Sequence, residues 1–347
     1  MFLCCRRGTG LQRTEGHISG LEKVRVAVIG VGEHGKRHAL AFKRGKGAEL
    51  AGVYDQREDR AQALAAELGV KAFSSLEEAL GAVQAVSIVI PTTDHAAVAR
   101  LALDAQIDVL LEKPITRTVE EADALIELAD RTGRILQVGH LERFNPGVVA
   151  AKAVTRQPLF FEIHRLGVFS PRSLDVDVVF DLMIHDLDLV LWMANAEVGE
   201  VRAVGLPVLT NRVDIANARV EFENGAVANF TASRVSTEKV RKFRYFQPHE
   251  YISIDFSRRD ALLLNVDHEG SRPGIAFRKL EVQNADPLEA ELESFVDCVR
   301  SRRPPLVGGR EGRSALALAE KVMSCIEEHA SRVQMPLTRP AGHSGEL

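Results

Sequence analysis

Three glycines near the start of the chain constrain its fold more than any other feature. Gly30, Gly32 and Gly35 have the spacing G-x-G-x-x-G, and they lie between the apolar run "VRVAVI" at 24–29 and a helical pattern. The first glycine permits a tight turn, the second allows a ligand close to the backbone, and the third lets the helix pack against the strand. The pattern therefore predicts a strand, a tight turn and a helix whose N-terminal N–H groups face an anion.

An acidic residue indicates which anion is bound. Asp55 ends the next predicted strand, 48–54, about twenty residues further on, where a carboxylate accepts hydrogen bonds from the ribose 2′-OH of a dinucleotide. The same carboxylate repels a 2′-phosphate, so NAD is the predicted cofactor and NADP is disfavoured, although Arg57 softens that preference. The alternative is that the glycines only make a turn and Asp55 only caps a helix.

The first half of the chain alternates short β-branched runs with helical patterns, as a parallel sheet covered by helices requires. The predicted strands are 24–29, 48–54, 70–73, 85–90, 108–111 and 134–138. We therefore predict an α/β domain at 23–145, a doubly wound Rossmann fold that binds NAD.

The second half reads differently. A helical stretch at 147–156 and an apolar helix at 176–194 are followed by alternating strands, with Asn224-Gly225 as a hairpin turn between two of them. This predicts an α+β domain at 146–305 for substrate binding and oligomerisation, with an open, mostly antiparallel sheet and helices on one face. A C-terminal helix at 306–333 is predicted to pack back on the Rossmann domain, with a disordered leader at 1–22 and a flexible tail at 334–347.

Composition excludes several classes of function. With 44 Lys and Arg against 48 Asp and Glu, the net charge is -4, so no global field attracts nucleic acid or an anionic membrane. No apolar run is long enough to span a bilayer, and the leader lacks the apolar segment of a signal peptide. The four cysteines, Cys4, Cys5, Cys298 and Cys325, form neither a disulfide framework nor a zinc spacing, so a cytoplasmic protein is predicted.

The predicted cofactor contacts lie at the ends of the parallel strands, where open α/β sheets bind ligands. They are Gly30, Gly32, Glu33, His34, Gly35, Asp55, Gln56, Arg57, Pro91, Thr92, His95, Glu112 and Lys113. For His95, a solvated position in the first turn of a helix is an equally good interpretation. Lys113 ends a strand in "LLEKPI" and could reach over the nicotinamide, with Pro114 fixing the backbone beside it. An ordinary surface lysine is the alternative.

The apolar segment "FDLMIHDLDL", 180–189, raises a second question because it carries several ionisable residues. On an α-helix, Asp177, Asp181, His185 and Asp188 would form one polar stripe on a largely buried helix, which costs several kcal/mol per unpartnered charge. Three interpretations remain open. His185 is a core histidine satisfied by a neighbouring aspartate, or the stripe binds a divalent metal, or His185 is a general acid/base oriented by an aspartate. The metal is disfavoured because the other ligands are unidentified, so no metal site is predicted.

Taken together, these residues resemble the glucose-fructose oxidoreductase, inositol dehydrogenase and MocA (Gfo/Idh/MocA) family from about Val24 to Val333. The resemblance rests on the glycine loop, "EKP", a D-x-x-x-H helix, the antiparallel sheet and the final helix. It implies a nicotinamide-dependent sugar or polyol oxidoreductase with Lys113, Asp181 and His185 as the catalytic set. The family more commonly has glycine two residues after the aspartate, and Met183 occupies that position here.

A narrower resemblance is carried by "VGHLERFNP" at 138–146 and by residues 164–193. Both are similar to the branch of the family that oxidises the 3-hydroxyl of UDP-N-acetylglucosamine to a ketone. It implies that Arg143, Asn145, Arg165 and Arg172 bind the nucleotide sugar, because guanidinium groups suit diphosphate oxygens. Taken singly, each arginine is better explained by a surface or interdomain ion pair. In the implied mechanism Asp181 fixes the His185 tautomer, and either His185 or Lys113 is the base.

Two further classes of function stay open from the sequence. Another sugar or polyol dehydrogenase, such as an inositol or hexose oxidoreductase, would use the same scaffold. A non-catalytic NAD-binding sensor is disfavoured because the lysine and the histidine are both retained. Alternating apolar residues on both faces of "YISIDF" and "ALLLNV" predict a homodimer or homotetramer formed through the C-terminal sheet.

Overall fold

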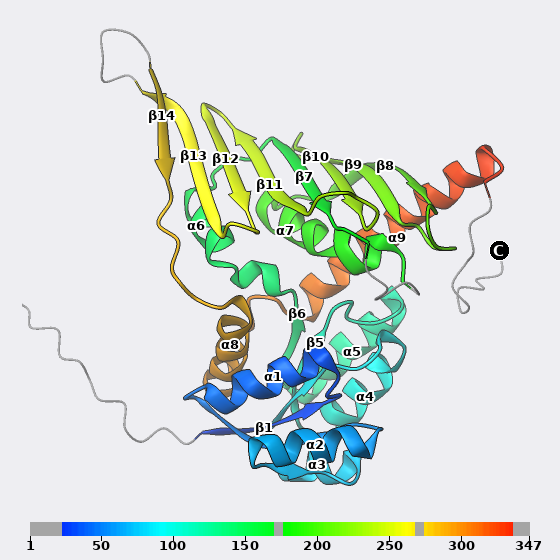
Figure 1. Cartoon of the computed structure of the whole chain (residues 1–347), viewed down its shortest axis with the longest axis vertical. Helices are drawn as coiled ribbons and strands as arrows, with labels where there is room; N and C mark the ends of the chain where they lie inside the picture. The colour runs from blue at the N-terminus through cyan, green and yellow to red at the C-terminus, as the bar shows by residue number, and fades with distance from the viewer. Residues whose placement is uncertain (1–22, 170–175, 268–273, 336–347) are drawn as a thin grey trace, which may run out of the picture.

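The computed structural model describes residues 23–169, 176–267 and 274–335. They form two sheets joined by helices (Figure 1). The expected leader at 1–22, Arg172 and nearly all of the expected tail lie outside the described residues. Among the described helices, none is long and apolar enough to cross a membrane.

The smaller sheet is the predicted Rossmann sheet. Its strands are β1 (Val24–Ile29), β2 (Ala48–Tyr54), β3 (Lys71–Ala72), β4 (Ala85–Ile88), β5 (Asp108–Glu112) and β6 (Leu136–Gly139). They pair in parallel in the order β3-β2-β1-β4-β5-β6, with the order reversing between β1 and β4. Ligands bind at such a reversal, outside the carboxyl ends of the strands. The predicted doubly wound fold is confirmed.

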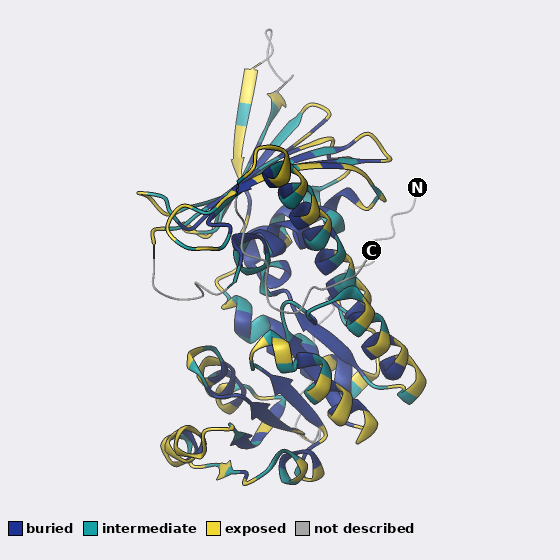
Figure 2. Ribbon diagram, turned by 90° about the vertical axis from the view of Figure 1, so that its right-hand side faces the viewer, coloured by how far each residue is buried: buried dark blue, intermediate teal, exposed yellow. Residues whose placement is uncertain are grey.

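Helices cover both faces of this sheet. They are α1 (Glu33–Arg44), α2 (Glu58–Leu68), α3 (Leu76–Ala82), α4 (Thr92–Asp104) and α5 (Val119–Thr132). Ser75 and Thr118 cap α3 and α5 by accepting hydrogen bonds from the backbone of Glu78 and Glu121. Figure 2 shows the result, with buried strands between helices whose outward faces are exposed.

The larger sheet is mostly antiparallel, as predicted. Its order is β14-β13-β12-β11-β7-β10-β9-β8, and only β7 and β10 pair in parallel. The strands are β7 (Phe160–Leu166), β8 (Val198–Leu206), β9 (Ile215–Phe222), β10 (Val227–Ser233), β11 (Val240–Gln247), β12 (Glu250–Asp255), β13 (Asp260–Asp267) and β14 (Gly274–Lys279). The Asn224-Gly225 hairpin joins β9 to β10, with Gly225 at φ +84°.

Three helices pack on one face of the larger sheet, and the opposite face is open (Figure 1). They are α6 (Pro146–Val154), α7 (Ile184–Ala194) and α9 (Gly309–Arg332), with the short turn η1 (Leu141–Phe144) before α6 and the π-helical turn η2 (Val179–Met183) before α7. Buried Phe161, Phe230, Phe243 and Tyr245 form the centre of the core between the sheet and these helices.

The last two helices depart from the predicted domain map. Helix α8 (Pro287–Ser301), expected in the second domain, packs through Leu292 and Phe295 against the Rossmann core. Helix α9 belongs to both domains, since Leu316 is buried in the Rossmann core and Val322 and Ile326 in the core of the larger sheet. The expected packing of this helix on the Rossmann domain therefore holds only for its first turns.

Candidate active site

The glycine loop has the geometry that its spacing predicts. Gly30 has φ +85°, and a Cβ there would collide with the Val89 carbonyl oxygen. A Cβ on Gly35 would collide with the Gly30 carbonyl oxygen, whereas one on Gly32 would meet nothing within 4 Å. Gly32 also precedes α1 without a side-chain cap. The loop thus presents open backbone and the N-terminus of α1 to the carboxyl edge of the sheet, which fits the pyrophosphate of a dinucleotide.

Asp55 braces this loop from the end of β2. Its carboxylate accepts hydrogen bonds from the backbone N–H groups of Val31 and Arg57, at 2.7 and 2.9 Å. The Arg57 guanidinium turns away and pairs with Asp59 at 2.8 Å, and Gln56 is exposed beside it. Because Arg57 is engaged by Asp59, the local charge facing a ribose is that of Asp55, which favours NAD over NADP.

His95 is neither solvated nor available to a cofactor. Its side chain is buried, with Nδ1 at 2.8 Å from the Pro114 carbonyl oxygen and Nε2 at 3.0 Å from that of Ile90. Burial lowers the pKa of His95, although these contacts oppose the shift. Both interpretations of His95 from the sequence were therefore wrong. The ring instead links the end of β4 to the Lys113–Pro114 segment, whose peptide bond is cis. Pro91 and Thr92 begin α4 beside it.

Two other predicted cofactor contacts face each other. His34, in the glycine loop, lies with Nε2 at 3.2 Å from Glu112 Oε1, at the end of β5. His38, one turn after His34, was not predicted, and its Nε2 lies at 3.3 Å from the same oxygen. The four-residue spacing of the two histidines on α1 was the available signal. Glu33 is exposed in the same turn.

Lys113 reaches from the Rossmann domain to η2. Its ammonium donates a hydrogen bond to the Asp181 carbonyl oxygen at 2.8 Å and lies 3.7 Å from the Asp181 carboxylate. Burial lowers the pKa of Lys113, and the charges of Asp181 and Glu112 oppose that shift. The lysine and the aspartate predicted from separate motifs, 68 residues apart, are thus in contact.

His185 begins α7 close to this pair, but Asp181 does not orient its ring. Its Nδ1 is buried without a hydrogen-bond partner among the described residues. Burial and the nearby positive charge of Lys113 hold the pKa of His185 well below its usual value, so the ring is neutral. The neighbouring ring is His140, which follows β6, with its centroid 6.5 Å away in an edge-to-face arrangement. His140 was not predicted, although its place after a parallel strand was a signal.

The expected polar stripe is not a single stripe. Asp177 accepts a hydrogen bond from the Val213 N–H, Asp181 faces Lys113, and Asp188 pairs with Arg143. The prediction assumed an uninterrupted α-helix, whereas η2 inserts a wider π-helical turn between Asp177 and His185. Such turns occur frequently at functional sites.

Arg143 and Arg165 were predicted to bind the diphosphate of the substrate, and this is corrected because both form buried ion pairs. Arg143 makes a two-pronged contact with Asp188, at 2.7 and 2.8 Å. Arg165 does the same with Asp186, at 2.7 and 2.8 Å, and also donates to Glu142. With their guanidinium groups buried against carboxylates, both arginines position the elements around the site. Of the alternative given for each arginine singly, a surface or interdomain ion pair, the interdomain part is observed in the pairs Arg143–Asp188 and Arg165–Glu142, and neither pair is on the surface.

Asn145 also has a structural partner. Its side-chain oxygen caps α6 by accepting the Gly147 N–H at 3.0 Å, and its amide donates to Glu142. Substrate contact by Asn145 stays a prediction, and so does that by Arg172.

Two family models match this chain. One, an oxidoreductase family with an NAD-binding Rossmann fold, matches residues 24–140, and the other, the GFO/IDH/MocA C-terminal domain, matches residues 148–246. The chain belongs to the Gfo/Idh/MocA oxidoreductase family. The predicted family, oxidoreductase class and NAD cofactor are therefore confirmed.

Individual relatives in this family cover nearly the whole chain. A UDP-N-acetylglucosamine 3-dehydrogenase of Acidithiobacillus ferrooxidans is 41% identical over 315 residues, covering 89% of this chain and 99% of that protein. Its crystal structure superposes with a TM-score of 0.83 over the same shares of the two chains. A myo-inositol 2-dehydrogenase of Thermotoga maritima is 28% identical, covering 89% of this chain and 98% of that protein. A levoglucosan dehydrogenase with bound NADH shares the fold, with a TM-score of 0.80 at 18% identity.

Proposed function

We propose that this member of the family oxidises the 3-hydroxyl of UDP-N-acetylglucosamine to a ketone, with NAD as the hydride acceptor. The observation that carries the proposal is the contact between Lys113 and Asp181 beside a half-buried, neutral His185. It is supported by the 41% identity to a dehydrogenase of that name over almost the full length of both proteins. Bound NAD supplies the hydride-accepting nicotinamide.

We assign the remaining roles to groups of the protein. The glycine loop and the N-terminus of α1 hold the pyrophosphate, and Asp55 holds the ribose. Neutral His185 accepts the proton of the sugar hydroxyl, because an unprotonated imidazole is a general base. The Lys113 ammonium, held in place by Asp181, donates a hydrogen bond to the oxygen on which negative charge develops. Asp181 therefore acts through Lys113 rather than through His185.

The test compares substrates on the purified protein. NAD reduction is followed by absorbance with UDP-N-acetylglucosamine, free N-acetylglucosamine and myo-inositol. We expect turnover with the nucleotide sugar and little with the free sugars. A preference for myo-inositol would replace this proposal with the second candidate, an inositol dehydrogenase, which the 28% identical relative favours. NAD binding without turnover on any of them would support the sensor.

We also propose that the protein is a homodimer or homotetramer formed through the open face of the larger sheet. A row of apolar side chains crosses five strands on that face, each paired in register with the next: Phe160, Phe246, Tyr251, Leu264 and Phe277. Phe160, Phe246 and Phe277 are 37%, 38% and 68% exposed. A continuous exposed apolar row of this kind is typical of a protein interface. A monomer in light scattering at micromolar concentration would contradict it.

The proposed compartment is the cytoplasm. Cys298 and Cys325 are free thiols, and Cys298 is buried. Free thiols are typical of a reducing compartment.

A further inference from the structure

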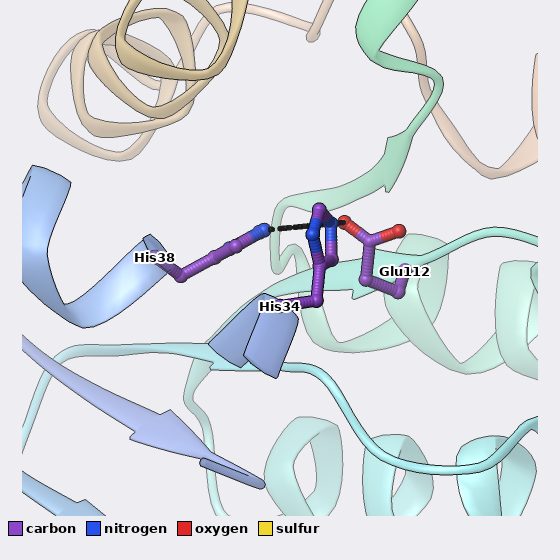
Figure 3. A group of neighbouring side chains, drawn as sticks. All are labelled: His34, His38 and Glu112. Carbon is purple, nitrogen blue, oxygen red and sulfur yellow. Dashed lines mark hydrogen bonds and ion pairs between the residues drawn. The ribbon is translucent and has the colours of Figure 1, made fainter. Parts of the chain in front are cut away.

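A compact group of three side chains lies beside the glycine loop. His34 and His38 come from successive turns of α1, and Glu112 comes from the end of β5 (Figure 3). The two imidazole Nε2 atoms are 3.3 Å apart, and each lies 3.2 or 3.3 Å from Glu112 Oε1. Three polar atoms thus form a nearly equilateral triangle.

Hydrogen bonds between neutral rings leave part of this triangle unsatisfied. A neutral imidazole nitrogen is either a donor or an acceptor, and its single proton points in one direction. If both Nε2 atoms donate to Glu112, the two N–H groups lie against each other. If one histidine donates to the other, that nitrogen has no proton left for the carboxylate. A cation bound by the two nitrogens and the carboxylate oxygen would satisfy all three atoms at once.

The dimensions of the triangle match those around a tetrahedral metal ion. Zinc binds imidazole nitrogen and carboxylate oxygen at about 2.0–2.1 Å, and tetrahedral angles then place neighbouring ligand atoms about 3.4 Å apart. The observed separations of 3.2, 3.3 and 3.3 Å are within 0.2 Å of that value.

The ligand atoms are also held in position from behind. His38 Nδ1 lies 2.9 Å from the Ser87 hydroxyl on β4, which turns Nε2 toward the triangle. Glu112 Oε2 accepts the Lys113 N–H at 3.3 Å, which leaves Oε1 for the triangle. Hydrogen bonds of this kind to the far side of a ligand are typical of metal sites, because they fix its orientation.

We propose that His34, His38 and Glu112 form a binding site for a divalent transition-metal ion of the zinc type. Two imidazoles and one carboxylate suit zinc and its neighbours in the first transition row rather than magnesium or calcium, which prefer oxygen ligands. The His38 side chain is buried and that of Glu112 is 12% exposed, whereas the His34 side chain is 41% exposed, so the ion enters from that side and keeps a fourth position open. The site does not depend on the proposed substrate.

The test measures metal binding directly. Full-length protein is treated with chelator and titrated with zinc chloride by calorimetry. We expect one ion per chain, and His34→Ala should weaken binding about 100-fold or more, since even an outer hydrogen-bond partner contributes 10- to 100-fold. Ser87→Ala should weaken it about 10-fold for that reason. His249→Asn, in the β11–β12 turn, is the matched control and should bind zinc like the wild type.

Two safeguards keep the experiment decisive. His34 is partly exposed, so His34→Ala is expected to fold, and an unchanged thermal unfolding midpoint checks this. Cobalt(II) added to the wild type should give the intense visible absorption of a tetrahedral site, and His34→Ala should lose it. The proposal is overturned if the wild type binds no zinc at one ion per chain, or if His34→Ala binds it as tightly as His249→Asn does.

Discussion

The Rossmann half and the sheet half of the molecule place their functional side chains in different ways. In the first half, backbone geometry places them, because glycines and strand ends fix where Gly32, Asp55 and Lys113 lie. In the second half, buried ion pairs between distant segments hold the elements in place, such as Arg143 with Asp188 and Arg165 with Asp186. The first half depends on local conformation, and the second on charge pairing in a dry interior.

The largest expected effect comes from the residue that joins the two halves. Lys113→Met should lower kcat about 1,000-fold, since positioned acid, base and hydrogen-bond donor groups contribute 10²- to 10⁴-fold. NAD affinity, measured by fluorescence titration, should change little, because the glycine loop is intact. Lys242→Met, on the open face of the larger sheet, is the control. Comparable turnover in the two variants would refute the catalytic role of Lys113.

Breaking a buried ion pair in the second half should lower the stability of the fold rather than act directly on the reaction. Arg165→Met leaves Asp186 and Glu142 without their buried partner, which should cost about 3–5 kcal/mol of unfolding free energy. Arg202→Met removes an exposed arginine paired with Glu200 and should cost less than about 1 kcal/mol. Denaturant unfolding measures both.

The double variant Arg165→Met with Asp186→Leu sharpens this result. Because it removes both charges, it should recover part of the lost stability. No recovery would mean that the bond from Arg165 to Glu142, rather than the pair with Asp186, carries the effect.

A smaller effect is expected in the cofactor half. Asp55→Ser should lower kcat/KM with NAD about 10- to 100-fold, the value of one hydrogen bond to a charged group, and should raise the NADP to NAD ratio. The matched control is Asp59→Ser, which leaves Asp55 in place. An unchanged cofactor preference in Asp55→Ser would show that Asp55 serves only to brace Val31 and the glycine loop.

The smallest effect is a dependence of stability on pH. The pKa of His185 is lowered in the folded protein, chiefly by burial, so the unfolded chain binds a proton more readily. The free energy of unfolding therefore has its full contribution from His185 at a pH above the ordinary histidine pKa of about 6.5. As the pH falls below that pKa, the contribution is lost by up to about 1.4 kcal/mol per pH unit. His185→Gln should show a shallower slope than His249→Asn in unfolding measured from pH 7 to pH 5. Equal slopes would contradict the burial of a neutral ring.

The same contrast explains how far the sequence could predict the structure. The Rossmann strands, the glycine loop and the hairpin at Asn224-Gly225 follow from local patterns, and the place of Lys113 follows from the carboxyl edge of a parallel sheet. The contact of Lys113 with Asp181 was not predicted, since Asp181 was expected to orient His185. The partners of Asp177, Asp186 and Asp188 do not follow from local patterns, since η2 changes the helical spacing and the partners come from far along the chain. His95 was misassigned because nothing in its local sequence reveals two carbonyl groups of other segments.

The long final helix limits how the two halves can move. Its 24 residues form one continuous rod, about 36 Å in length, with one end embedded in each core. A hinge that opened the halves would have to bend this rod or pull one end from its core, and both carry a free-energy penalty. Reactants should therefore enter and leave a preset frame, and turnover should be governed by local loop motions rather than by swinging of whole domains.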